Sequence, residues 1–193
     1  MFITRADLAR DWQPDAEHSR AVPGRVHQGL VREWVAVAGP ALQLQVENAL
    51  NTEGCSLLAR DGRVPFAAYL RLHELIAELD HQNDGAAFAD RWLRDVAAQI
   101  SPVARLPLRA LGPKRGLLLL PRLWPEVWCA PAPQLEFGKT SCMISHFTGL
   151  PVDHPTLALL LVLQFELAMQ LLTGGRGSVQ VLDSKKLTLR LAW

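Results

Sequence analysis

The sequence is poor in cysteine and in net charge, and both shortages exclude classes of protein. Its three cysteines, Cys55, Cys129 and Cys142, are too few and too scattered for a disulfide framework, and an odd number favours a reducing, cytoplasmic setting. Its net charge of +1, from 20 basic and 19 acidic side chains, provides no overall field that would draw the protein to nucleic acid or to an anionic membrane. We therefore expect no nucleic-acid partner.

The sequence also lacks an apolar run long enough to cross a membrane. Charged residues interrupt each short apolar stretch of residues 1–15, so no signal peptide is expected. The most apolar stretch, residues 157–172, contains Gln164, Glu166 and Gln170 and is shorter than the roughly 20 apolar residues that a bilayer requires. We expect a core helix here and no membrane span. Because apolar residues surround its first half, this helix could also meet a second copy in a homodimer.

The motifs of the common catalytic and phosphate-binding sites are missing as well. The chain contains no G-x-S-x-G, Walker A, H-E-x-x-H or kinase motif. Gly174, Gly175 and Gly177 follow a predicted helix and precede a predicted strand, the reverse of the order in a phosphate-binding loop, which favours a helix C-cap. We therefore expect a non-enzymatic protein without a cofactor.

The composition is that of a folded globular domain. Hydrophobic residues make up 49% of the 193 residues and charged residues 20%, enough apolar material for a sizeable core. Residues 1–24 are mixed in character and end in the turn signal Pro23-Gly24, so we interpret them as a peripheral N-terminal arm. Residues 25–193 are predicted to form one domain.

Periodicity predicts helices first and strands later. Apolar residues at three- and four-residue steps predict helices over residues 26–49 (with a break at Gly39-Pro40), 64–80, 85–100, 101–112 and 114–124. Residues 135–148 are then predicted to form one long strand with a bulge near Gly138. Asp153 is expected to cap a helix over 155–172, and alternation over 179–193 predicts a hairpin that ends at Trp193.

This order of elements predicts an α+β fold. We expect an N-terminal helical layer packed on a C-terminal antiparallel sheet, in the order β-α-β-β.

Cys142 and His146 are the best candidates for metal ligands, with Cys129 and His154 nearby. Residues four apart on a strand point to the same side, and thiolate with imidazole suits zinc. The alternative is a core cysteine and a surface histidine, which the lack of C-x-x-C and H-x-x-x-H spacing favours.

Two other residues could take part in chemistry. His73 lies beside the apolar face of helix 64–80 and could be a general base or a haem ligand, although a histidine bordering the core is the more common case. Cys55 could be a nucleophile, with buried inert cysteine as the alternative.

One segment carries only basic charges. From Ser101 to Pro125 the charged residues are Arg105, Arg109, Lys114, Arg115 and Arg122. Such a stripe could hold an anion or the acidic surface of a partner protein. The alternative is a solvated face, balanced by the acidic residues Glu74, Glu78, Asp80, Asp84, Asp90 and Asp95.

Several short strings together resemble a known group. These are Val64-Pro65-Phe66, residues 110–115 (ALGPKR) before a leucine-rich helix, and the ending of residues 190–193 (RLAW). The chain resembles an uncharacterised myxobacterial single-domain family that is itself similar to haem-nitric-oxide-binding and four-vinyl-reductase-like sensor domains. The resemblance covers roughly residues 28–193 and implies a domain that holds a ligand between helices and sheet, or that binds partner proteins. In the haem-binding relatives a histidine on the helix before the long strand ligates iron. Residues 108–124 contain no histidine here, which argues against haem.

The resulting hypothesis is a sensor or adaptor domain that binds a small molecule or a partner protein. A ligand pocket is expected between helices and sheet, lined by Trp92, Phe137, Ile144 and Phe165. The alternatives are a structural subunit of a larger assembly and an enzyme that uses a metal or a thiol.

Overall fold

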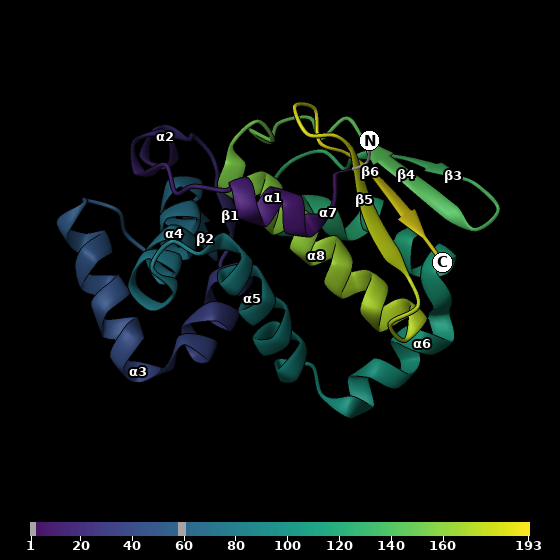
Figure 1. The fold of residues 1–193 in the computed structure, drawn as a ribbon, viewed down its shortest axis with the longest axis horizontal. Helices are drawn as coiled ribbons and strands as arrows, with labels where there is room; N and C mark the ends of the chain where they lie inside the picture. The colour runs from purple at the N-terminus through teal and green to yellow at the C-terminus, as the bar shows by residue number, and fades with distance from the viewer. Residues whose placement is uncertain (1–2, 58–60) are drawn as a thin grey trace.

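A computed structural model describes residues 3–57 and 61–193 of the chain, with side chains except at residues 32–37 and 102. The fold is α+β, as predicted, with most helices before the main sheet in the chain (Figure 1). The helices are α1 (Arg5–Asp11), α2 (Ala16–Ala21), α3 (Gly29–Thr52), α4 (Phe66–His81), α5 (Gly85–Gln99), α6 (Pro102–Leu117), α7 (Leu120–Trp128) and α8 (Pro155–Thr173). The strands are β1 (Arg25–His27), β2 (Arg63–Pro65), β3 (Gln134–Phe137), β4 (Ser141–Ser145), β5 (Ser178–Asp183) and β6 (Thr188–Ala192).

Local sequence signals set the ends of several helices. The side chains of Asp84 and Ser101 accept backbone N–H groups at the starts of α5 and α6, as capping residues do. Gly174 takes a left-handed conformation that ends α8, which confirms the predicted C-cap. The start of α8 differs from expectation, because its N-cap is His154 and not Asp153.

Two long helices bend at Gly-Pro pairs. Gly39 in α3 and Gly112 in α6 have φ angles of 74° and 72°, outside the helical range, and each is followed by proline. Proline cannot donate the helical hydrogen bond, and glycine tolerates the positive φ that the bend needs. The predicted break at Gly39 is therefore confirmed. At Gly112 the chain bends within α6, and the next helix starts only at Leu120.

The main sheet is antiparallel, with strands in the order β3-β4-β6-β5. The prediction of one long strand over residues 135–148 was wrong, because the chain turns at residues 138–140 and forms the hairpin β3–β4. Leu135 pairs with Ile144 and Phe137 with Cys142, so the turn brings these residues to one face. The order is therefore β-β-α-β-β. The predicted C-terminal hairpin is confirmed, and its inward residues Leu187, Leu189 and Leu191 are fully buried.

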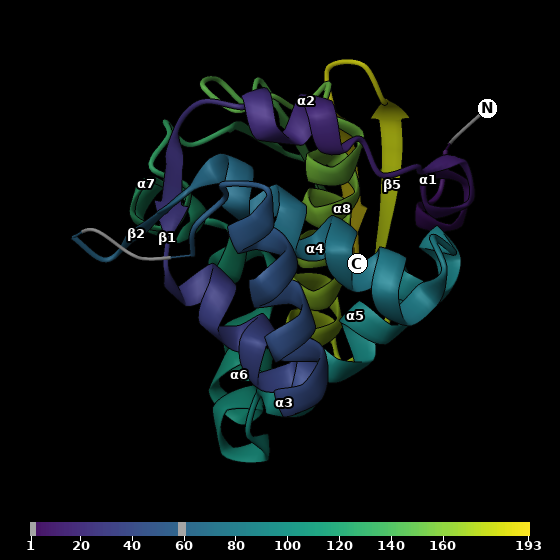
Figure 2. The ribbon, with the colours of Figure 1, turned by 90° about the vertical axis from the view of Figure 1, so that its left-hand side faces the viewer.

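Helix α8 lies at the centre, between the main sheet and helices α4 and α5 (Figures 1 and 2). Its consecutive residues Leu160, Leu161, Val162 and Leu163 are all completely buried. Four consecutive helical residues point in all directions, so elements of the same chain cover every side of this half of α8. By length and composition it is also a helix that could cross a membrane, with mean hydropathy 1.7, but 67% of that stretch is buried inside the molecule.

The N-terminal residues pack on the helical layer. Ala9 and Trp12 are buried, and the Trp12 ring stacks on Phe88 of α5 at 5.5 Å between centroids. Ile3 pairs with Val181 of β5 as an isolated bridge. Helices α1 and α2 therefore join the sheet edge to α4, α5 and α8.

Candidate functional site

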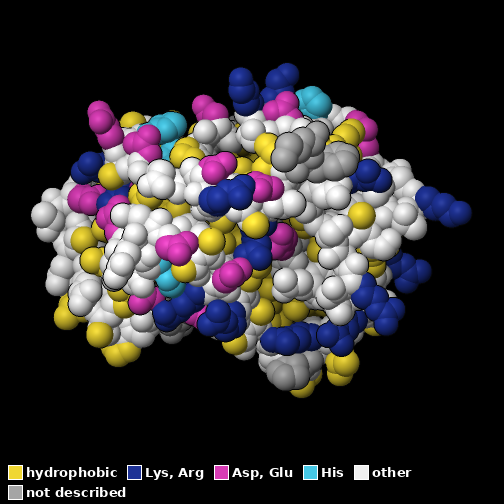
Figure 3. All heavy atoms as spheres, in the orientation of Figure 1, with side chains coloured by type: hydrophobic (Ala, Val, Ile, Leu, Met, Phe, Trp, Pro, Cys, Tyr) yellow, Lys and Arg dark blue, Asp and Glu magenta, His cyan; other side chains and the backbone are white. Residues whose placement is uncertain are grey.

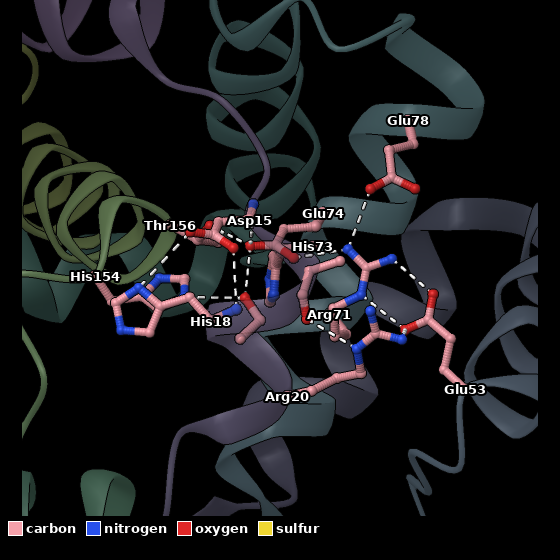
Figure 4. A network of polar contacts seen from close by, with 12 residues as sticks. Asp15, His18, Arg20, Glu53, Arg71, His73, Glu74, Glu78, His154 and Thr156 are labelled. Atoms are coloured by element: carbon pink, nitrogen blue, oxygen red, sulfur yellow. Dashed lines mark hydrogen bonds and ion pairs between the residues drawn. The ribbon is translucent and has the colours of Figure 1, made fainter.

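A buried polar cluster joins α2, α4 and α8 around the carboxylate of Glu74, which is completely buried (Figure 4). One carboxylate oxygen, Oε1, accepts hydrogen bonds from the hydroxyls of Ser19 and Thr156, both at 2.6 Å, and from the backbone N–H of Asp15 at 3.3 Å. The other oxygen accepts one from Arg71 at 2.7 Å. Both oxygens of the buried carboxylate thus have a donor, as a buried charge requires.

Arg71 connects this carboxylate to two others. Its guanidinium is 2% exposed and donates to both oxygens of Glu53, at 2.8 and 2.9 Å, and to Glu78 at 3.1 Å. Burial alone would lower the pKa of Arg71, but the hydrogen bonds to the three glutamates raise it, so the guanidinium stays charged. The pairing with Arg71 lowers the pKa of Glu53. The cluster therefore fixes α4 against the end of α3.

Ser19 and His154 lie together but do not form a nucleophilic pair. Ser19 Oγ is 3.0 Å from His154 Nε2, and the ring of His18 lies 4.4 Å from that of His154. In a Ser-His-Asp triad the serine gives its proton to the histidine, and an acid binds the other ring nitrogen of that histidine. Here the acid, Glu74, binds the serine hydroxyl itself, and His154 Nδ1 has no hydrogen-bond partner among the described residues. Burial lowers the pKa of His154. This arrangement suits a structural cluster.

The structure does not bring together the residues predicted as metal ligands. Cys142 points into the core and is completely buried, and burial raises the pKa of its thiol to about 11. Strand β4 ends at Ser145, so the strand parity that would align His146 with Cys142 no longer applies. His146 is exposed and has a φ of 57°. The described residues contain no group of three or more His, Cys, Asp or Glu side chains suited to a metal.

The two residues considered for other chemistry are a completely buried histidine and a half-buried thiol. His73 is completely buried in α4 and donates from Nδ1 to the carbonyl of Tyr69 at 2.8 Å. Burial lowers its pKa to about 4, so the ring is neutral at neutral pH. Cys55 is half-buried after α3, and burial raises the pKa of its thiol, which keeps the thiol protonated.

An apolar groove runs along α8. Two neighbouring cavities share Gln164 and Ala168 of α8 as lining residues. The first, of about 180 Å³, is lined by Leu30, Tyr69, Trp92, Val96, Gln164, Leu167, Ala168 and Leu171. The second, of about 240 Å³, is lined by Gly116, Leu117, Leu120, Leu123, Trp124, Val127, Trp128, Gln164, Phe165, Ala168 and Leu172. We call the two together the α8 groove.

The α8 groove lies between helices, whereas the sequence predicted a pocket between helices and sheet. Of the four residues proposed for that pocket, Trp92 and Phe165 line the α8 groove, one in each cavity. Phe137 and Ile144 lie instead on the hairpin β3–β4, where Ile144 is completely buried.

The basic segment, residues 101–125, forms α6 and most of α7 and borders the groove. Arg105 differs from the others, because its guanidinium donates to the carbonyls of Ala97 and Ile100 and closes the end of α5. Arg109, Lys114, Arg115 and Arg122 are exposed. Figure 3 shows dark blue side chains along the lower right of the molecule, where α6 lies in Figure 1.

Large apolar side chains are exposed on the same segment. They are Val103 (77% exposed), Leu106 (67%), Leu118, Leu119 and Leu123. Single exposed leucines are normal, but this segment holds five of the eight large apolar residues that are exposed among the described side chains. A basic and apolar surface of this kind can receive an acidic, amphipathic partner.

Sequence reasoning missed the polar cluster. Glu74 was assigned to an acidic surface that balances the basic segment, whereas it is buried and paired with Arg71. The signal that could have revealed the pair is the i,i+3 spacing of opposite charges within the apolar run Tyr69–Ala77.

Comparisons with protein-family models, with curated proteins and with solved structures gave no match.

Proposed function

We propose that this chain is a non-enzymatic adaptor that binds an acidic, amphipathic helix of a partner protein in the α8 groove. The observation that carries the proposal is the position of the groove beside a segment whose charges are all basic. The alternative within the same hypothesis, a small-molecule sensor, is less favoured here. Each cavity by itself is below the roughly 300 Å³ of typical ligand pockets, so a small molecule would have to span both.

The shape of the groove fits one face of a helix. The shared and neighbouring lining residues Gln164, Ala168 and Leu171 stand at steps of four and three on α8, so the floor is a straight line of about 10 Å. A helix laid along it would present apolar side chains at the same spacing, as in other helix-in-groove complexes. Leu123 and Trp124 form part of the wall, and tryptophan is among the residues that contribute most to binding energy at interfaces.

The charge beside the groove favours an acidic partner. Arg115 and Arg122 are exposed and directly precede Gly116 and Leu123, which line the second cavity. Carboxylates on the polar face of a bound helix would meet these guanidinium groups at the rim. Such complementary charges speed association and select against basic partners.

Two further features support a non-enzymatic role and a cytoplasmic location. Glu74 holds the hydroxyl of Ser19, the serine nearest a histidine in the cluster, which supports a non-enzymatic role. The free thiols of Cys55, Cys129 and Cys142 support a cytoplasmic location.

The test uses two helical peptides with identical leucine positions, one with glutamate and one with lysine at the polar positions. Fluorescence anisotropy is expected to show saturable binding of the glutamate peptide alone. Ala168→Arg should abolish this binding because the new side chain fills the groove. Gln170→Arg, on the exposed side of the same helix, adds the same charge and should leave it unchanged.

Three outcomes would overturn the proposal. The first is equal binding of the glutamate and lysine peptides, or an equal loss of glutamate-peptide binding in Ala168→Arg and Gln170→Arg. The second is a dimer that Ala168→Arg dissociates, because the groove would then hold a second copy of this chain. The third is sedimentation with vesicles of anionic lipid but no peptide binding, because a lipid surface would then be the partner of the basic segment.

A further inference from the structure

A second hollow lies at the other end of α8, between the loop that follows β4 and the turn of the hairpin β5–β6. Its volume is about 570 Å³, within the range of small-molecule sites. It is lined by Ser145, His146, Phe147, Thr148, Leu150, Val152, Asp153, Lys185, Lys186 and Thr188. None of these residues lines the α8 groove.

Two adjacent lysines form one side of this hollow, and the chain holds them in place. The carboxylate of Asp183 accepts the backbone N–H groups of Lys185 and Lys186, at 2.9 and 3.1 Å, which fixes the turn. Leu187 follows in a left-handed conformation and is completely buried, which anchors the turn to the core. Neither lysine makes an ion pair with another described residue. Their charge is therefore open to an anion.

Hydrogen-bonding groups line the same hollow. Ser145 and Thr148 carry hydroxyls, and Ser145 Oγ lies 2.9 Å from His146 Nδ1. That contact leaves His146 Nε2 available to a ligand. His146 also has a φ of 57°, a left-handed conformation that histidine adopts more readily than most side chains.

The remaining lining is mostly apolar. Phe147 and Leu150 are buried and Val152 is half-buried. Together they form the apolar part of the lining beside the polar groups. Asp153 is the one acidic residue of the lining, against two lysines. An anion that carries an apolar organic group could therefore pair with the lysines and pack on the apolar side chains.

We propose that this hollow binds a small-molecule phosphate monoester with an apolar or aromatic organic part. Lys185, Lys186 and His146 contact the phosphate, and the side chains of Leu150 and Val152 contact the organic part. Phosphate suits this set because its oxygens accept several charge-assisted hydrogen bonds at once. The inference goes beyond the adaptor function and does not depend on it.

The test is titration calorimetry with phenyl phosphate, phenol and inorganic phosphate as probes. Phenyl phosphate is expected to bind more tightly than either of its parts. Lys185→Ala with Lys186→Ala should weaken its binding by about tenfold or more, since two charge-assisted contacts are lost. The matched control, Lys139→Ala with Arg176→Ala, removes the same charge from exposed positions outside both the hollow and the α8 groove and should leave binding unchanged. Asp153→Asn should strengthen it.

Circular dichroism and the melting temperature show whether each variant is folded, and the glutamate peptide shows whether the α8 groove is intact. No saturable binding of phenyl phosphate at millimolar concentration by the unaltered protein would overturn the proposal. Equal weakening in the control variant would do the same, because overall charge and not the hollow would then attract the anion. Phenol binding as tightly as phenyl phosphate, or a phosphotyrosine peptide binding more tightly, would also contradict a small phosphate ester as the ligand.

Discussion

At the scale of single residues, Glu74 is the least expected feature of the chain. Its carboxylate is completely buried, yet it receives donors from α2, α4 and α8 and from the backbone of Asp15. A buried ion pair is weak evidence for stability, but removing one partner leaves the other charges and donors unsatisfied. The cluster therefore specifies how these three helices dock.

We expect Glu74→Ala to lower the free energy of unfolding by about 3 kcal/mol or more, because Arg71, Ser19 and Thr156 lose a common acceptor at a buried site. Glu78 binds the same guanidinium, but a third of its side chain is exposed. Glu78→Ala should therefore cost at most about 1 kcal/mol. Urea denaturation of the two variants measures both values. Similar small losses in both would contradict a stabilising role of the buried cluster.

At the scale of elements, local signals predicted best where they decide a boundary by themselves. Ser101 and Gly174 mark helix ends, and the alternating residues of β6 mark a strand. The hairpin β3–β4 was missed because a short turn and a bulged strand place the same residues on one face. Phe137 and Cys142 share a face in either arrangement. Only the pairing of strands distinguishes a hairpin from a bulged strand.

The N-terminal arm shows a second limit of local signals. Nothing in residues 1–24 shows by itself that Trp12 packs on Phe88 and donates to the hydroxyl of Thr156 on α8 at 3.3 Å. The start of α5 is shaped for this contact, because a Cβ at Gly85 would lie 2.2 Å from the carbonyl oxygen of Ala9. Such complementarity between distant segments is a property of the tertiary structure.

Trp12→Ala is expected to lower the free energy of unfolding by about 3–5 kcal/mol, because it removes a large buried side chain and leaves a cavity between α1 and α5. It should also make residues 1–24 more sensitive to limited proteolysis. Leu8→Ala, at a partly buried position of α1, the helix that Trp12 follows, serves as a control with a smaller loss. An arm that is cleaved readily in the unaltered protein, with no loss of stability, would contradict this.

At the scale of the whole molecule, the two parts of the proposed partner site differ in how far the sequence predicts them. The basic segment is contiguous, so Arg109, Lys114, Arg115 and Arg122 can be found by reading the chain. The groove beside it depends on how α5, α6 and α7 pack around α8. Trp92 and Phe165 were predicted to line a ligand pocket, and both line this groove, but the sequence placed the pocket against the sheet.

The C-terminal strand shows the same dependence on the whole fold. The sequence predicts β6 as the last strand of a hairpin, which would suit an edge position. In the structure β6 lies between β4 and β5, and Leu191 pairs with Cys142 on one side and Val179 on the other. The backbone N–H of Trp193 then donates to the carbonyl of Thr140 in the turn of β3–β4, at 3.0 Å.

Because β6 is central, its removal should affect the entire sheet. We expect a chain that ends at Leu187 to lose cooperative unfolding, since it lacks the buried side chains of Leu189 and Leu191 and the strand pairs on both sides. Trp193→Ala should leave the fold intact with a smaller loss of stability, because that side chain is half-buried and the strand keeps its pairs. Thermal denaturation followed by circular dichroism compares the two. If the shortened chain unfolds as cooperatively as Trp193→Ala, β3 and β4 must stay in the sheet without β6. That outcome would contradict the central position of β6.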